Sequence, residues 1–298
     1  MPRSDLTNQL TLFDLPVEDR VVNVASVPQR SPFRYPGGKT WLVPRIRQWL
    51  RAASFRPDVL VEPFAGGAIV GLTVAFEQLT EEVLLVELDT DVGAVWETVL
   101  GNDSKWLVDR ILSFDLTNST LSEELERPTR STRQRAFRTI LRNRTFHGGI
   151  LAPGSRPIRR GENGKGLRSR WYPQTLARRI REIAQIRDRV AFLAGDGMET
   201  ITQFAPRKNA TFFIDPPYSA AGKRAGTRLY TCHSLDHQKL FDLVSRIKGD
   251  FLMTYDCADE ILNLAHKHGF ETRQVAMKNT HHARMTELLI SRDLSWFK

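Results

Sequence analysis

The stretch Phe212-Phe213-Ile214-Asp215-Pro216-Pro217-Tyr218 is an apolar run that ends abruptly in an acid, two prolines and an aromatic ring. Proline cannot donate a hydrogen bond to a sheet and holds φ at about −65°, so a strand formed by this run must stop at Asp215. The acid and the ring are then displayed on a rigid edge, where a ligand can bind. An ordinary strand exit, with an Asp that caps a helix, is the alternative interpretation.

Similar apolar runs recur along the chain. Residues 59–62 run into a glycine turn and a helix to about position 79, and residues 83–87 form a second apolar run that ends in an acid. Helices are expected between most of the runs, so we predict a Rossmann-like, open, mostly parallel sheet of seven strands. The remaining strands are predicted at 190–193, which leads to Gly195-Asp196, and at 211–214, 250–255, 273–277 and 285–291, the last two as a terminal hairpin.

The first two predicted strands carry residues suited to a nucleoside cofactor. Gly66 and Gly67 follow the first strand and allow a cofactor to lie against the backbone. The dinucleotide fingerprint G-x-G-x-x-G is absent, because Ala68 stands at its second glycine. Glu87, at the tip of the second strand, can accept paired hydrogen bonds from a ribose diol, or it can cap a helix instead.

Composition excludes several classes of protein. The chain has 298 residues, and its most apolar window, 59–76, is broken by Glu62, Pro63 and three glycines, so no membrane helix of about 20 residues is predicted. The N-terminus lacks the apolar core of a signal peptide, and two cysteines are too few for a disulfide framework, which favours a cytoplasmic location. The histidine pairs at 266 and 268 and at 281 and 282 are poorly spaced as ligands, so no metal site is predicted.

Basic residues are concentrated in one segment. Residues 127–189 contain 18 Arg and Lys against three acids, a net charge of +15, whereas the whole chain carries +9. Arginine presents a planar fork that suits phosphates and guanine edges, so we predict that this segment contacts nucleic acid. A helix is expected at 133–144, with loops at 145–150 and 161–166.

The N-terminal region adds two short motifs. Residues 1–30 show no long periodic pattern and are expected to be a mobile leader. Within it, Gln9-Leu10-Thr11-Leu12-Phe13 resembles the peptides by which bacterial replication and repair proteins dock on the sliding clamp, although these apolar groups could instead pack back on the domain. Gly38-Lys39-Thr40 is a weak phosphate-loop match, because Phe33 stands where that motif needs glycine.

Seven short motifs follow one another along the chain. They are Arg-Tyr-Pro-Gly-Gly-Lys (34–39), Glu-Pro-Phe-Ala-Gly-Gly (62–67), Val-Glu-Leu-Asp (86–89), Arg-Asn-Arg-Thr-Phe-His-Gly (142–148), Trp-Tyr-Pro (171–173), Asp-Pro-Pro-Tyr (215–218) and Thr-Glu-Leu-Leu-Ile (286–290). Together they resemble a known family, the DNA adenine-N6 methyltransferases of the alpha arrangement (Dam-like enzymes). The resemblance covers about residues 31–292 and implies a class I methyltransferase fold and site-specific methyl transfer from S-adenosylmethionine to the N6 amine of a flipped-out adenine in double-stranded DNA.

The resemblance implies a role for each matching residue. Asp215, Pro216 and Tyr218 would form the catalytic site, in which the carboxylate and the proline carbonyl accept the two N–H groups of adenine and the ring stacks on the base. The residues implied to hold S-adenosylmethionine are Tyr35, Lys39, Gly66, Gly67, Glu87, Asp196 and Asp215. The residues expected to contact DNA are Arg142, Asn143, Arg144, His147, Arg159 and Arg160.

The resemblance also implies a division of the chain. Residues 31–110 and 190–298 would form the catalytic domain, with residues 111–189 inserted as a mainly helical target-recognition region, and the enzyme would act on DNA as a monomer in the cytoplasm. Two departures from the family concern Glu87, where the family has Asp, and the arginine-rich insert, which differs from common members. The recognised bases and any restriction-modification role therefore stay open.

Three other functions stay open from the sequence. The same strand-tip geometry serves cytosine N4 or the N6 of adenine in RNA, although the acid at position 215 favours adenine. A catalytically silent DNA-binding module is a further alternative. Lys39, Glu87 and Asp215 are all present, which argues against it.

Overall fold

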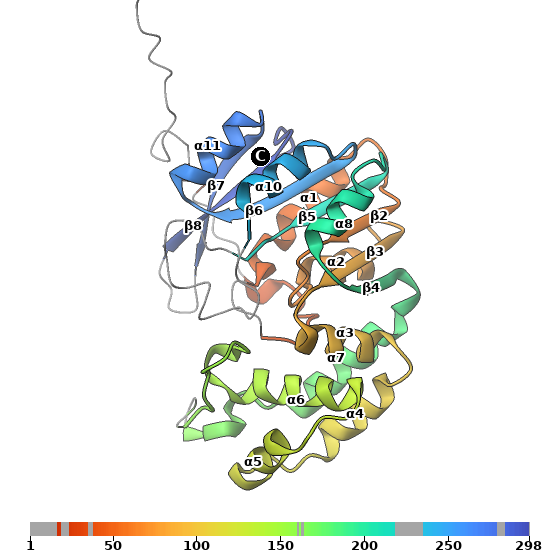
Figure 1. Ribbon diagram of the computed structural model, residues 1–298, viewed down its shortest axis with the longest axis vertical. Coiled ribbons are helices and arrows are strands. Elements are labelled where there is room, and N and C mark those ends of the chain that lie inside the picture. The colour runs from red at the N-terminus through yellow and green to blue at the C-terminus, as the bar shows by residue number, and fades with distance from the viewer. Residues whose placement is uncertain are drawn as a thin grey trace, which may run out of the picture.

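A central β-sheet organises the molecule. The computed structural model describes residues 17–18, 24–34, 38–159, 161, 164–217, 235–278 and 284–297. Within these residues the sheet has eight strands in the order β1-β7-β8-β6-β5-β2-β3-β4 (Figure 1). The strands are β1 (Val17–Glu18), β2 (Val59–Glu62), β3 (Glu82–Glu87), β4 (Val190–Ala194), β5 (Ala210–Ile214), β6 (Asp250–Asp256), β7 (Glu271–Lys278) and β8 (Arg284–Ser291).

The seven predicted strands are confirmed, and so is their Rossmann-like arrangement. Strands β4, β3, β2, β5 and β6 pair in parallel, while β8 runs antiparallel to both β6 and β7. The terminal hairpin is therefore confirmed as well. One expectation needs correction, because part of the leader joins the sheet: β1 adds a parallel edge strand to β7. A two-residue strand has no apolar run by which the sequence could reveal it.

Alternating side chains along the strands supply the two faces of the core. Leu60 and Phe213 face one apolar cluster, whereas Val61 and Phe212 face the other. Helices α1, α2 and α3 pack in the first cluster, and α8, α10 and α11 pack in the second. Strands covered on both faces read as nearly continuous hydrophobic runs, which is why they could be recognised from the sequence.

Ten α-helices are described. Four of them, α4 to α7, follow α3 in the chain, precede β4 and form a helical lobe beside the sheet (Figure 1). The lobe packs on α3 through α6 and α7. The helices are α1 (Val43–Ala52), α2 (Ile69–Phe76), α3 (Thr90–Leu100), α4 (Ser104–Ser113), α5 (Asn118–Glu126), α6 (Thr132–Thr145), α7 (Pro173–Gln185), α8 (Gly197–Phe204), α10 (His237–Ser245) and α11 (Asp259–Lys267).

The expected helix at 133–144 corresponds to α6. The segment expected as a loop at 145–150 contains a short 3₁₀ helix, η4 (His147–Gly149). Two other 3₁₀ helices bear on the site, η3 (Lys39–Leu42) and η6 (Gly166–Arg170). In the described part of the chain, no helix combines the length and apolarity needed to cross a membrane.

Candidate active site

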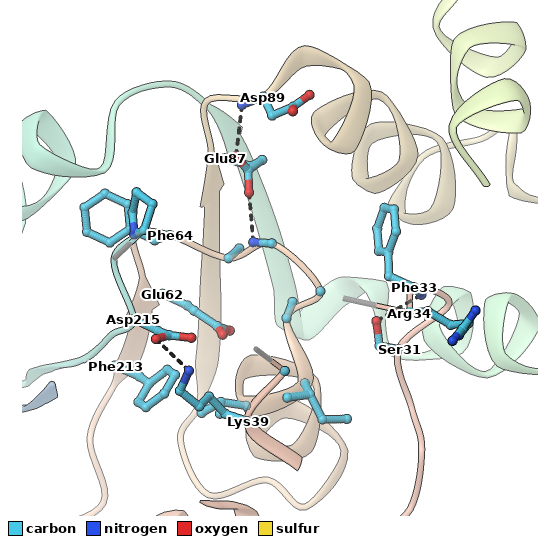
Figure 2. Close-up of a pocket in the computed structure, with 18 of the residues that line it drawn as sticks. Ser31, Phe33, Arg34, Lys39, Glu62, Phe64, Glu87, Asp89, Phe213 and Asp215 are labelled. Atoms are coloured by element: carbon cyan, nitrogen blue, oxygen red, sulfur yellow. Dashed lines mark hydrogen bonds and ion pairs between the residues drawn. The ribbon is translucent and has the colours of Figure 1, made fainter. Parts of the chain in front are cut away.

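Acidic residues gather at the carboxyl edge of the sheet. Glu62 and Glu87 end β2 and β3, while Asp196 and Asp215 follow β4 and β5. In an open parallel sheet this edge is where ligands bind, at the point where the strand order reverses, here between β2 and β5. All four acids line one cavity of about 930 Å³, part of which Figure 2 shows.

The turn after β2 is fixed to the tip of β3. The Ala65 amide donates to the Val86 carbonyl at 2.9 Å, and the Gly66 amide donates to Glu87 Oε2 at 2.8 Å. The Trp96 indole N–H holds the Gly66 carbonyl at 2.9 Å. Gly66 has φ +46°, a backbone conformation that favours glycine. Gly66 and Gly67 both line the cavity, so the turn presents bare backbone to a ligand.

Glu87 is held by the backbone on both sides. Its Oε2 accepts from Gly66 and its Oε1 accepts from the Asp89 amide at 2.9 Å (Figure 2). Burial raises the pKa of this carboxyl to about 7, and the amides of Asp89 and Gly66 oppose that rise. Each carboxylate oxygen keeps a further lone pair. The half-buried Glu87 is thus oriented at the cavity wall and can still accept hydroxyl groups from a ligand.

Asp215 lies in a network with a buried cation. Its Oδ1 is 2.9 Å from Lys39 Nζ, at the start of η3, and accepts a hydrogen bond from the Thr254 hydroxyl at 2.8 Å. Lys39 is only 2% exposed and also lies 3.5 Å from Glu287 Oε2, on β8. These contacts fix one oxygen of the Asp215 carboxylate and leave the group at the cavity wall.

Two acids of the site were not predicted as site residues, Glu62 and Glu287. Both are nearly fully buried. Burial raises the pKa of Glu62 well above its usual range, and the Gly71 amide, which donates to its Oε2 at 2.8 Å, opposes the shift. Burial also raises the pKa of Glu287, to about 7, against the favourable charge of Lys39. Glu62 could have been suspected because it ends an apolar run just as Glu87 does.

Asp196 joins the cavity through the start of α8. Its Oδ1 accepts the Met198 amide at 2.7 Å, so it caps this helix. The next residue, Gly197, packs against the glycine turn so closely that a Cβ would lie 2.1 Å from the Pro63 carbonyl oxygen. The close contact brings Asp196 beside the same cavity as Glu87.

The opposite wall of the cavity is basic and comes from the helical lobe and the segment before η3. Four arginines line it: Arg34, Arg144, Arg170 and Arg179. Arg144 is almost fully buried, and burial together with the neighbouring arginines lowers its pKa to about 9. A second hollow of about 540 Å³ adjoins this wall and is lined by Arg34, His147, Arg159 and Arg170, among other residues. The arginines of the wall repel one another, and an anionic ligand bound beside them would reduce that repulsion.

The residues expected to contact DNA separate into two groups. Arg144, His147 and Arg159 line the cavity or the adjoining hollow. Asn143 is 0% exposed and brackets Arg34, accepting from its amide at 2.8 Å and donating to its carbonyl at 2.9 Å. Arg142 donates to the Leu151 carbonyl at 2.7 Å. Asn143, which was expected to contact DNA, is thus buried and supports the wall, while the DNA contact expected of the partly exposed Arg142 stays a prediction.

Most of the residues predicted to bind the cofactor or to act in catalysis lie at the cavity. Lys39, Gly66, Gly67, Glu87, Asp196, Asp215 and Pro216 all line the cavity of about 930 Å³. Tyr35, Arg160, Tyr218 and the peptide at 9–13 lie outside the described residues. Among the residues that are described, no group of three or more His, Cys, Asp or Glu side chains could hold a metal ion.

The buried cation predicts a large effect on stability. Lys39→Met should lower the free energy of unfolding by about 3–5 kcal/mol at pH 8, because it leaves buried carboxylates without their cation. At pH 5 the loss should be smaller, since Glu287, with its raised pKa, is then neutral. Urea unfolding at both pH values measures the difference. The control is Lys105→Met, which removes an exposed pair with Asp109 and should cost about 0.3–0.5 kcal/mol; equal losses for the two variants would refute the structural role.

Comparison with solved structures gives matches of low identity. A Pyrococcus horikoshii protein described as an RNA methyltransferase is 10% identical with a TM-score of 0.40, covering 90% of this chain and 92% of that one. The rRNA methyltransferase AviRa from Streptomyces viridochromogenes is 13% identical with a TM-score of 0.38, covering 87% and 86%. Likenesses this distant carry no argument about function. No curated protein sequence matches the chain.

A family model gives the decisive match. The model of the D12 class N6 adenine-specific DNA methyltransferases matches residues 35–279. This span is most of the chain, and it runs from the segment before η3 through the acidic strand ends to β7. The chain therefore belongs to the D12 class of N6 adenine-specific DNA methyltransferases.

Proposed function

We propose that this enzyme methylates the N6 amine of an adenine that has been extruded from double-stranded DNA at a specific sequence. The observation that carries the proposal is the Asp215 carboxylate, held by Lys39 and Thr254 at the edge of a cavity that also contains the glycine turn and Glu87. The cavity therefore contains both a carboxylate that can accept a hydrogen bond from an amine and a site suited to a nucleoside cofactor.

S-adenosylmethionine is the methyl donor of this family and supplies, when bound, a methyl group on a positively charged sulfur. The residues present fit it. A cavity of about 930 Å³ is within the usual size of cofactor sites. Glu87 offers a fixed carboxylate to the ribose diol, Gly66 and Gly67 offer bare backbone to the methionine part, and Asp196 can accept from the adenine amine of the cofactor.

The chain's own residues prepare the target amine. The lone pair of adenine N6 is delocalised into the ring, which makes the nitrogen a poor nucleophile. When Asp215 and the Pro216 carbonyl each accept one N–H, the nitrogen becomes pyramidal and its lone pair turns toward the methyl group. The carboxylate also stabilises positive charge that develops on nitrogen in the transition state. Transfer is then direct, with no covalent bond to the enzyme.

The depth of the site supports extrusion of the target base. Asp215 is bonded to Lys39, which is 2% exposed, and both line a cavity between the sheet edge and the arginine wall. A paired base inside a duplex cannot reach such a carboxylate, so the target nucleotide must rotate out of the stack. Residues 111–189 are the DNA-contacting region in this proposal, and residues 31–110 and 190–298 the catalytic domain.

Asp215→Ala should lower the single-turnover rate of methyl transfer by about 1,000-fold or more, because one acceptor that stabilises developing charge is lost. Binding of S-adenosylmethionine and of DNA should stay measurable by calorimetry and by fluorescence anisotropy. The control is Asp188→Ala, an exposed acid just before β4, which should leave the rate unchanged. Substantial residual turnover by Asp215→Ala would remove the assigned role.

The raised pKa of Glu87 predicts a pH-dependent cofactor affinity. The ribose hydroxyls bind the ionised carboxylate, so affinity should rise by about tenfold from pH 6 to pH 8 as a group with a pKa of about 7 loses its proton. Glu87→Gln should bind more weakly and without that dependence. Glu82→Gln, an exposed residue at the start of the same strand, is the matched control. A pH-independent affinity of the unmodified protein for S-adenosylmethionine would reject this contact.

The arginines of the wall and of the adjoining hollow predict a salt effect on DNA binding. Each phosphate contact contributes about 0.9 to the slope of log affinity against log salt concentration. Replacing both Arg34 and Arg159 with alanine should therefore reduce the magnitude of that slope by about 2. The control replaces Arg127 and Arg178, which already pair with Glu124 at 3.5 Å and Glu182 at 3.1 Å. Equal slopes for both double variants would reject this surface as the DNA contact.

A further inference from the structure

The buried network around Lys39 contains one more carboxylate than the methyl-transfer step uses. Lys39 Nζ lies 2.9 Å from Asp215 Oδ1 on one side and 3.5 Å from Glu287 Oε2 on the other. A single ammonium group thus bridges a carboxylate at the cavity wall and a carboxylate in the core. Within the proposed function, Asp215 contacts the target amine, whereas Glu287 has no assigned role.

The two carboxylates have unequal surroundings. Asp215 Oδ1 accepts a hydrogen bond from the Thr254 hydroxyl at 2.8 Å and makes the shorter ion pair with Lys39, at 2.9 Å. Glu287 is 2% exposed, and its Oε2 makes only the longer contact with Lys39, at 3.5 Å. Burial of a carboxylate with so weak a contact favours its protonated form. A proton is therefore favoured on Glu287, at the inner end of the Lys39 bridge.

Most of the charged groups that face Glu287 also favour its protonated form. Asp256 is its register partner on β6, and Asp215 lies beyond Lys39, so two negative charges oppose ionisation of Glu287. Lys39, from η3, is the cation that opposes them. Burial is the largest influence, and it raises the pKa of Glu287 to about 7. A group with this pKa can both hold and release a proton near neutral pH.

Methylation of an amine must release one proton. The N6 lone pair forms the new bond to carbon, the bond between carbon and sulfur breaks with its electron pair left on sulfur, and the nitrogen then carries a positive charge until one N–H is lost. Asp215 is the first acceptor in the proposed function. If it kept the proton, the site would have to return that proton past the bound product before the next turnover.

We propose that Glu287 is the final acceptor of the proton released from adenine N6, which it receives from Asp215 through Lys39. Asp215 Oδ1 passes the proton to Lys39 Nζ as Lys39 gives one of its own protons to Glu287 Oε2. Lys39 remains an ammonium group, Asp215 becomes charged again, and Glu287 becomes neutral. Glu287 acts through Lys39 and does not touch the substrate. This inference rests on the proposed function.

The test is the pH profile of the single-turnover rate, measured with S-adenosylmethionine saturating at every pH so that Glu87 does not contribute. The rate of the unmodified enzyme should fall below about pH 7, because Glu287 is then already protonated. Glu287→Gln should be slower at pH 8, on the order of 100-fold, and should lack an ionisation near pH 7. Glu287→Asp should retain one.

Glu77→Gln is the control, since Glu77 is also largely buried and pairs with Arg47 at 2.7 Å, but it follows α2 and does not line the cavity. It should leave the rate and the profile unchanged. A Glu287→Gln enzyme with the full rate, or with the ionisation near pH 7 still present, overturns the proposal. A uniform loss of rate that keeps this ionisation would assign Glu287 a structural role only and overturns it as well.

A second measurement covers the case in which Glu287→Gln fails to fold. Carbon-13 NMR of glutamate carboxyl groups in the free, unmodified protein should show Glu287 titrating near pH 7, and a titration near pH 4.5 overturns the proposal. The NMR result does not depend on catalysis. Absence of methyl transfer by the unmodified enzyme would contradict the proposed function, whereas an ordinary titration of Glu287 would contradict only the proton route.

Discussion

The Lys39 ammonium is the interaction on which the candidate site depends. Three strand ends deliver the carboxylates of Glu62, Glu87 and Asp215 to one edge of the sheet, and β8 adds Glu287 from beside β6. So many negative charges would repel one another in a poorly hydrated space. Lys39 compensates for two of them directly, and burial raises the pKa values of Glu62 and Glu287, which favours their neutral forms. Lys39 and Thr254 hold Oδ1 of the Asp215 carboxylate at the cavity wall.

The segment that carries Lys39 is itself held by the helical lobe. Asn143, on α6, brackets the Arg34 backbone, while Arg144 donates to the Pro32 carbonyl and Arg179, on α7, donates to the Ser31 carbonyl at 2.9 Å. The arginine wall and Lys39 therefore share one support. Lys39 and this supported segment are separated by only a few residues of chain, so in the proposed function a displacement of the lobe by DNA would be transmitted to Lys39. This connection gives a physical route by which target binding can influence the chemistry.

Much of the fold could be predicted because buried parallel strands leave a plain signal. The run that ends at Asp215 is apolar on both faces and stops at two prolines, and the run before Glu87 is similar. The role of Glu287 could not be read in the same way, because it meets Lys39 only when β8 pairs with β6. Asn143 was expected to contact DNA, yet it is buried where α6 packs against η4. Local sequence reports on strands and turns, whereas burial of polar groups depends on which distant elements meet.

The most direct test of the central claim is to identify the methylated nucleoside by mass spectrometry. Double-stranded DNA is incubated with the unmodified enzyme and S-adenosylmethionine, then digested to nucleosides. An acid that accepts from an amine at a strand tip, in a member of the D12 class, predicts N6-methyldeoxyadenosine as the product, with none formed by Asp215→Ala. N4-methyldeoxycytidine as the product, or methylation of RNA alone, would contradict the account.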